Sequence, residues 1–157
     1  MGKRDDLILI KAGGFRFIGI LETADAPATV ALFRSMLPYT QKLIHVRWSG
    51  EGMWIPLGET GWASSLPNEN HTAHPAPGQL LLYPGGISET EFLFAYGGVS
   101  FASKMGPLTA NHFLTVVAGQ EQLRALGEKT LWEGAQEVAF DYATDEDIKS
   151  IKAVSRL

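Results

Sequence analysis

The chain has 157 residues, a formal net charge of −4 and no cysteine. That length suits one domain, and an acidic chain lacks the basic surface that nucleic acids or anionic membranes require. The absence of cysteine excludes disulfides, thiol catalysis and thiolate zinc sites. We therefore expect a single domain over residues 1–157, and its 17 glycines and 8 prolines favour a turn-rich, strand-rich fold.

Apolar runs alternate with turn residues in the first half of the chain. Four of them predict short strands, at 7–10, 16–21, 42–46 and 53–55. The first two flank a glycine-containing turn, which predicts a β-hairpin. Apolar residues at helical spacing predict a helix over 27–37, with Asp25 as its N-cap and Pro38 at its end.

The second half begins with a long segment, 57–78, that is rich in glycine, proline and asparagine. Such a loop in a compact domain is usually functional or disordered, and a linker between two domains is the alternative. Further strands are expected at 79–83, 91–96, 112–117 and 136–142. A helix is expected over 119–126, with Gly127 as its C-cap, and a helical turn near 130–133.

The C-terminal tail, residues 143–157, is expected to form a short helix. Thr144 and Asp147 resemble a capping pair, and Ile148, Ile151 and Val154 lie three residues apart. Short strands with two or three short helices together predict a mainly β fold, a small closed barrel with helices over its ends. Closure removes the strand edges that invite aggregation.

Several motifs are similar to those of bacterial cyclophilin-like barrels. Residues 47–54, RWSGEGMW, resemble a strand-turn-strand signature, and residues 75–86, PAPGQLLLYPGG, resemble an apolar strand between two Pro-Gly turns. Residues 86–91, GISETE, and the pair Asn111-His112 resemble one bacterial family of unknown function in that superfamily. The resemblance spans residues 7–142 and implies a closed eight-stranded barrel with two helices, related to peptidyl-prolyl isomerases.

Isomerases of this fold set a catalytic arginine beside phenylalanine, methionine and glutamine side chains. The resemblance implies that Arg47 and Met53 occupy two of these places, whereas Gly52 and Ile55 stand at the other two. A weak peptidyl-prolyl isomerase or a peptide-binding module is therefore an alternative function.

The first hypothesis is a small-molecule site at the barrel mouth. Arg47 would pair with an anionic group of the ligand, and Trp54 and Tyr96 would bury its apolar part. Glu69 and Asn70 in the long loop would add polar contacts, although asparagine is also an ordinary turn residue.

Two residues are candidate catalytic bases in that site. Glu91 begins an apolar strand after a Pro-Gly-Gly turn, and with Glu89 it forms a pair of carboxylates on one face of an extended segment. His112 is the second candidate, because the ordinary pKa of a histidine side chain suits a proton acceptor near neutrality. A solvated acid and a histidine that bonds a backbone carbonyl are the structural alternatives.

Other chemistry is not indicated by the sequence. His71 and His74 lie near Glu69, but a proline-rich loop does not direct two such rings one way, so a solvated loop is favoured over a metal site. No nucleophile elbow, phosphate loop, dinucleotide fingerprint or zinc-protease motif occurs. We expect no metal and no cofactor.

The expected partner is a small molecule, with neither nucleic acid nor membrane. No apolar window approaches the roughly 20 residues of a membrane helix, and the first residues do not resemble a signal peptide, so a cytoplasmic protein is expected. A non-catalytic subunit that forms homo-oligomers through the apolar tail residues is a third hypothesis.

Overall fold

The computed structural model describes residues 4–155, with side chains described up to residue 152. The strands are β1 (Leu7–Ala12), β2 (Phe15–Leu21), β3 (Tyr39–His45), β4 (Gly50–Pro56), β5 (His71–Thr72), β6 (Gln79–Tyr83), β7 (Glu91–Val99), β8 (Ala102–Ser103), β9 (Gly106–Pro107), β10 (Ala110–Ala118) and β11 (Gln136–Tyr142). The α-helices are α1 (Pro27–Met36), α2 (Leu123–Glu133) and α3 (Asp145–Ser155).

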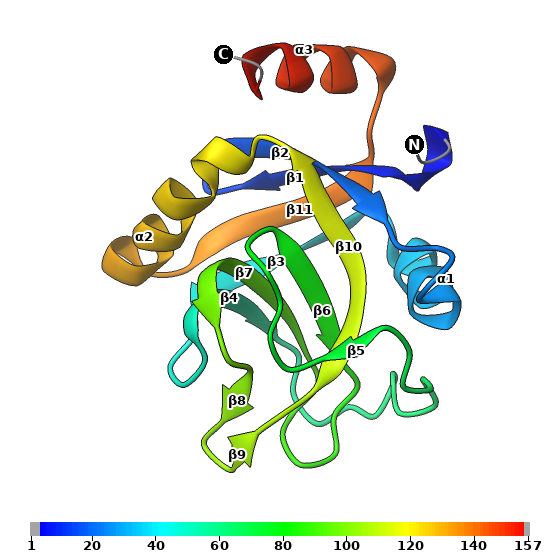
Figure 1. Cartoon of the computed structure of the whole chain (residues 1–157), viewed down its shortest axis with the longest axis vertical. Helices are drawn as coiled ribbons and strands as arrows, with labels where there is room; N and C mark the ends of the chain where they lie inside the picture. The colour runs from blue at the N-terminus through cyan, green and yellow to red at the C-terminus, as the bar shows by residue number, and fades with distance from the viewer. Residues whose placement is uncertain (1–3, 156–157) are drawn as a thin grey trace.

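Eight antiparallel strands close into a barrel (Figure 1). They follow the order β2-β1-β11-β3-β4-β7-β6-β10, and the pairing of β10 with β2 completes the circle. The short strand β5 adds to β10, while β8 and β9 form a separate two-stranded hairpin. The closed eight-stranded barrel predicted from the sequence is thus confirmed.

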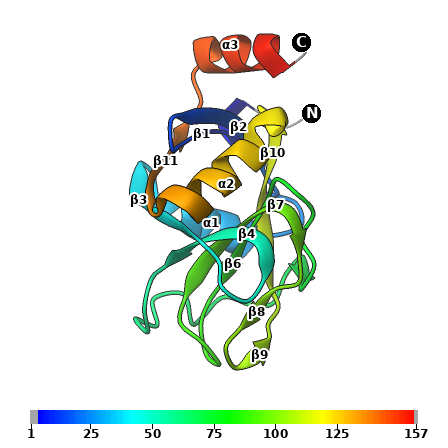
Figure 2. The same cartoon turned by 90° about the vertical axis from the view of Figure 1, so that its left-hand side faces the viewer.

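The barrel interior holds the main hydrophobic core, and two helices close its ends. Phe33 of α1 and Leu126 of α2 are fully buried in the same cluster as the inward residues of the strands. Figure 2 looks towards one end of the barrel, with α2 in front of α1. Both ends are therefore covered, as the helix positions in Figure 1 also show.

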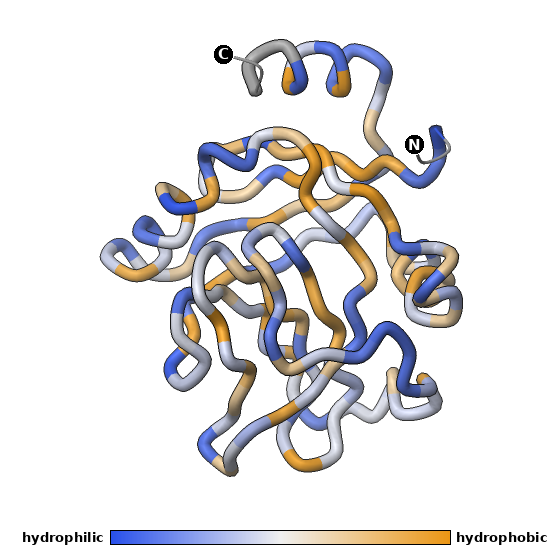
Figure 3. The backbone as a smooth tube through the Cα atoms, in the orientation of Figure 1, coloured by the Kyte–Doolittle hydropathy of each residue, from blue (hydrophilic) through white to orange (hydrophobic). Residues whose placement is uncertain are grey.

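Helix α3 covers the outer face of β1 and β2. Ile148 and Ile151 pack there against Leu7, Leu9 and Ile18, and the hydrophobic residues of α3 face the barrel in Figure 3. This explains the unbroken apolar run at the start of β1, because both faces of that strand are buried. The side chain of Val154 lies outside the described residues.

Two helix boundaries differ from the prediction. Helix α2 continues through Gly127 to Glu133, so Gly127 is not a C-cap. Asp25 does not cap α1; the N-cap is Ala26, and it supplies no side-chain hydrogen bond. The predicted capping pair of α3 is confirmed, since Asp147 N donates to Thr144 Oγ1 and Thr144 N donates to Asp147 Oδ2, each at 3.0 Å.

A second hydrophobic cluster lies on the outside of the barrel wall. It joins the outward residues of β6 and β7, such as Leu81 and Leu93, to Phe101 and Leu108 from the segment that carries β8 and β9. Strand β7 is consequently buried on both faces. None of the described helices is long and apolar enough to cross a membrane.

Candidate functional site: a pocket on the outer barrel wall

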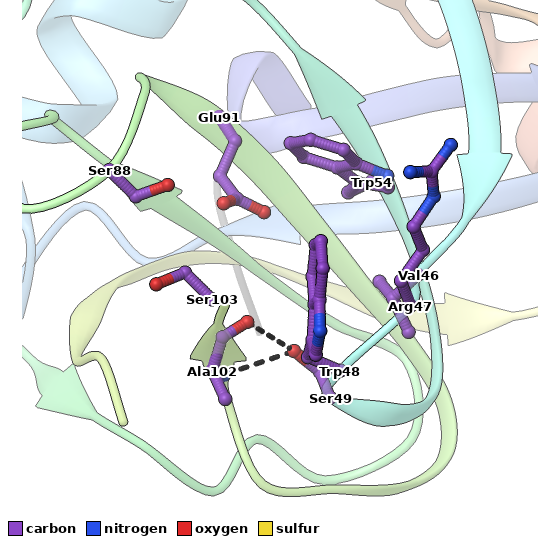
Figure 4. A pocket seen from close by; sticks show the side chains of 9 residues that line it. All are labelled: Val46, Arg47, Trp48, Ser49, Trp54, Ser88, Glu91, Ala102 and Ser103. Carbon is purple, nitrogen blue, oxygen red and sulfur yellow. Dashed lines mark hydrogen bonds between the residues drawn. The ribbon is translucent and has the colours of Figure 1, made fainter. Parts of the chain in front are cut away.

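A small pocket lies where the turn from β3 to β4 meets the start of β7 and strand β8 (Figure 4). Its enclosed volume is about 30 Å³, within an open hollow of about 290 Å³ that includes the mouth. The lining residues are Val46, Arg47, Trp48, Ser49, Trp54, Ser88, Glu91, Ala102 and Ser103.

Strand alternation decides which side chains reach this pocket. On β4, Met53 and Ile55 point into the core, so Trp54 between them points outward. On β7, Phe92 points inward and Glu91 outward. The pocket therefore lies on the outside of the wall and not at the barrel mouth, where the sequence hypothesis placed it.

Ser49 fixes the wall of the pocket. Its hydroxyl donates to the carbonyl of Ala102 and accepts from the amide of Ala102, both at 3.0 Å. The amide of Ser100 also donates to the carbonyl of Ser49 at 3.0 Å. These bonds hold β8 against the turn after β3, so two segments far apart in sequence form one rigid rim.

Glu91 is the unusual residue of the pocket. The residue is only 5% exposed, and its carboxyl group makes no hydrogen bond or ion pair within residues 4–155. Burial, together with the nearby charge of Glu89, raises the pKa of Glu91 to about 8. The carboxyl group is therefore mostly protonated at neutral pH.

Two indole rings lie between the acid and the cation of the pocket. Trp54 Nε1 is buried without a hydrogen-bond partner among the described residues, whereas Trp48 is 50% exposed. In the view of Figure 4 the Glu91 carboxyl group lies on one side of the Trp54 and Trp48 rings and the Arg47 guanidinium group on the other. The pocket thus combines an acid at one side, a cation at the other and two flat apolar surfaces.

His112 and Asn70 lie together in a different place. Asn70 Nδ2 donates to the carbonyl of His112 at 2.9 Å and lies 3.2 Å from His112 Nδ1. An amide nitrogen only donates, so Nδ1 accepts and Nε2 carries the proton towards Thr115 Oγ1 at 2.6 Å. Thr115 Oγ1 in turn donates to Glu22 at 2.6 Å. Burial lowers the pKa of His112, opposed by Glu22, and both ring nitrogens are already engaged.

Glu69 binds the start of α1. Its Oε2 accepts hydrogen bonds from the amide and the hydroxyl of Thr29, both at 2.7 Å. The amide of Glu69 donates to Asn111 Oδ1 at 3.2 Å, and Asn111 Nδ2 donates to Thr29 Oγ1 at 3.0 Å. The Glu69 carboxylate, from the long loop, therefore caps the N-terminus of α1, a role that was predicted for Asp25.

Tyr96 lies at the α2 end of the barrel. Its hydroxyl is 2.7 Å from His45 Nε2, and the Arg124 guanidinium lies 5.4 Å from its ring centre. Burial raises the pKa of Tyr96, with a smaller contribution from Glu51. Its ring packs on α2 at Gly127, where an added Cβ would come within 2.4 Å of ring atoms.

The structure divides the expected site among three places. Arg47, Trp54 and Glu91 share the pocket, whereas Tyr96 lies at the α2 end and the remaining residues, Glu69, Asn70 and His112, lie around α1 and β10. Six lining residues were not among the predicted site residues: Val46, Trp48, Ser49, Ser88, Ala102 and Ser103. A tryptophan directly after Arg47 was the one available signal. Among residues 4–155, no group of three His, Asp or Glu side chains could hold a metal ion.

Residues 8–142 match a family described as a protein of unknown function, DUF3830. The chain belongs to the DUF3830 family. The match covers the whole barrel together with α1 and α2, and α3 follows it. No curated protein sequence matches this DUF3830 chain.

Solved structures share the fold of this DUF3830 chain at low sequence identity. McbB, in a structure with tryptophan, has a TM-score of 0.66 and 19% sequence identity. The match covers 88% of this chain but only 46% of McbB. A hypothetical protein from Archaeoglobus fulgidus has a TM-score of 0.55 and 17% identity, covering 91% of this chain and 100% of that one. A cyclophilin-type peptidyl-prolyl cis-trans isomerase from Cryptosporidium parvum has a TM-score of 0.51 and 12% identity, covering 88% and 99%. These similarities establish the cyclophilin-like fold.

Proposed function

We propose that the pocket on the outer wall binds a small carboxylate with a flat apolar body. The observation that carries this proposal is the buried Glu91, which has no partner of its own in a pocket that also contains an arginine and two tryptophans. An uncompensated polar group is costly in a protein interior, which makes a role in binding the better explanation for its presence.

The lining residues match such a ligand. The Arg47 guanidinium presents paired donors that suit a carboxylate, and the Trp48 and Trp54 rings offer flat surfaces for an apolar body. The enclosed part of the pocket, about 30 Å³, has room for only one or two water molecules, so the flat body of the ligand would lie in the open mouth against the exposed Trp48 ring.

Titration calorimetry with para-methylbenzoate tests the proposal. We expect Arg47→Ala to weaken its binding by about tenfold or more, roughly 1.4 kcal/mol, because the charged partner of the carboxylate is lost. Lys104→Ala is the matched control, since Lys104 is an exposed cation next to Ser103 that does not line the pocket. Equal affinity for para-methylbenzamide, which has no charge, would contradict the assignment of Arg47.

Peptide binding at the same pocket is a second candidate. Ile87 and Met105, both 67% exposed, lie close in sequence to the lining residues Ser88 and Ser103, and with Trp48 they give the rim an apolar character. Two residues were assigned by the resemblance to isomerases. Arg47 reaches the pocket, whereas Met53 is fully buried in the core and does not. Exchange spectroscopy on an alanine-proline peptide would show faster cis/trans exchange if this candidate is correct.

A further inference from the structure

The outer face of β7 is apolar except at Glu91. Leu93, Ala95 and Val99 follow on the same face of the strand and pack in the outer cluster. A leucine or methionine at position 91 would continue that pattern, whereas a carboxyl group loses its hydration there. Packing alone therefore does not account for an acid at this position.

The surroundings of Glu91 indicate which ligand group its carboxyl group could pair with. Ser88 and Ser103 line the same side of the pocket with hydroxyl groups, and Arg47 lies on the other side of the two indole rings in Figure 4. The other titratable neighbour is Glu89, whose carboxylate accepts a hydrogen bond from the Gly58 amide at 2.9 Å and adds negative charge. None of the described residues that line this end of the pocket is a cation, so a ligand would have to bring one.

We infer that the ligand carries a basic nitrogen that pairs with Glu91, at the opposite end of its flat body from the carboxylate that pairs with Arg47. This inference rests on the proposed function and narrows its ligand class to small zwitterions whose two charges are separated by a ring. An α-amino acid carries both charges on one carbon and does not reach from Arg47 to Glu91 past the two indole rings.

Binding of such a ligand moves one proton. In the free protein the Glu91 carboxyl group holds its proton; as the ammonium group of the ligand arrives, the O–H bond breaks and the proton passes to the buffer. The ligand keeps all its N–H bonds, and an ammonium–carboxylate ion pair remains. At neutral pH close to one proton is released, because the free carboxyl group is mostly protonated.

Three ligands that differ by one group test the inference. They are para-(aminomethyl)benzoate with both charges, para-methylbenzoate without the amine, and benzylamine without the carboxylate. Calorimetry near neutral pH in phosphate and in Tris buffer gives affinity and proton release together. We expect the zwitterion to bind tighter than para-methylbenzoate by about tenfold or more. Binding of the zwitterion should release close to one proton, and binding of para-methylbenzoate should release none.

Variants assign the effect to Glu91. In Glu91→Gln the zwitterion and para-methylbenzoate should bind equally, without proton release, while Glu59→Gln, which changes an exposed carboxylate that does not line the pocket, should keep the preference. If para-methylbenzoate binds the wild type as well as the zwitterion does, or if binding takes up a proton, the inference is overturned and the proposed function stands. If neither carboxylate binds, both are overturned.

Discussion

Glu91 shows how one residue can link function to stability. Its pKa is about 8 in the folded protein and about 4.3 in an unfolded chain. Between these values the folded state holds a proton that the unfolded state has lost, so the free energy of unfolding falls as pH rises. The loss is on the order of 1.4 kcal/mol for each pH unit in that window and ends above the folded pKa.

Glu91→Gln should therefore stabilise the protein at neutral and mildly alkaline pH. The amide cannot ionise, so the variant and the wild type should be similar near about pH 5 and should diverge by on the order of 1.4 kcal/mol per unit up to about pH 8. Urea unfolding at three pH values measures the difference. Glu59→Gln, at an exposed carboxyl outside the pocket, is the control, and a Glu91→Gln curve parallel to that of the wild type would contradict the prediction.

Sequence reasoning selected three residues that line one pocket, but it did not predict how the candidate residues are arranged. Arg47, Trp54 and Glu91 were selected because charge, aromaticity and a strand-entry acid are visible in a single sequence. Glu69 and His112 were grouped with them, but Glu69 bonds to Thr29 and His112 to Asn70, each about 40 residues away in the chain. Only the folded barrel shows that these polar groups are already engaged.

At the scale of elements, periodicity predicted the longer strands and α1 close to their observed bounds, but it did not predict the bounds of α2. Strands β6 and β11 have the predicted bounds, and α1 ends one residue early. A glycine ordinarily ends a helix, but Gly127 lies inside α2 because the Tyr96 ring occupies the space of a side chain. The strands β8 and β9 have two residues each, too few for a periodic pattern, and so the wall that completes the pocket was missed.

Gly127→Ala should destabilise the protein even though it improves helix propensity. The added methyl group would lie within 2.4 Å of the Tyr96 ring, whose hydroxyl is bound to His45, so the ring cannot easily move away. The overpacking costs about 1–3 kcal/mol and outweighs the gain of roughly 1 kcal/mol from replacing a helical glycine.

Thermal and urea unfolding measure that change, with Ala125→Gly as the matched control. Ala125 is exposed on the same helix, so there the alanine should be the more stable residue by about 1 kcal/mol. Both variants should therefore be less stable than the wild type, because glycine is the better residue at position 127 and alanine at position 125. A stabilised Gly127→Ala variant would show that Tyr96 does not pack on α2 as described.

At the scale of the whole molecule, the barrel is covered by different elements on different sides. Helices α1 and α2 close its ends, the β8–β9 segment covers β6 and β7, and α3 covers β1 and β2. Single-sequence patterns indicate that a strand is buried on both faces but not what covers each face. The hypothesis of an oligomer built through the tail depends on this point, since an apolar helix face can cover its own barrel or a second chain.

Ile151 decides between these two uses of α3. It is only 6% exposed and packs within its own chain, so Ile151→Ser should lower the free energy of unfolding by about 2–3 kcal/mol, because it removes a buried aliphatic side chain. The oligomeric state, measured by sedimentation, should not change. Lys149→Ser on the exposed side of α3 is the control and should alter neither quantity. An oligomer that dissociates in Ile151→Ser but not in Lys149→Ser would instead assign this face of α3 to an interface between chains.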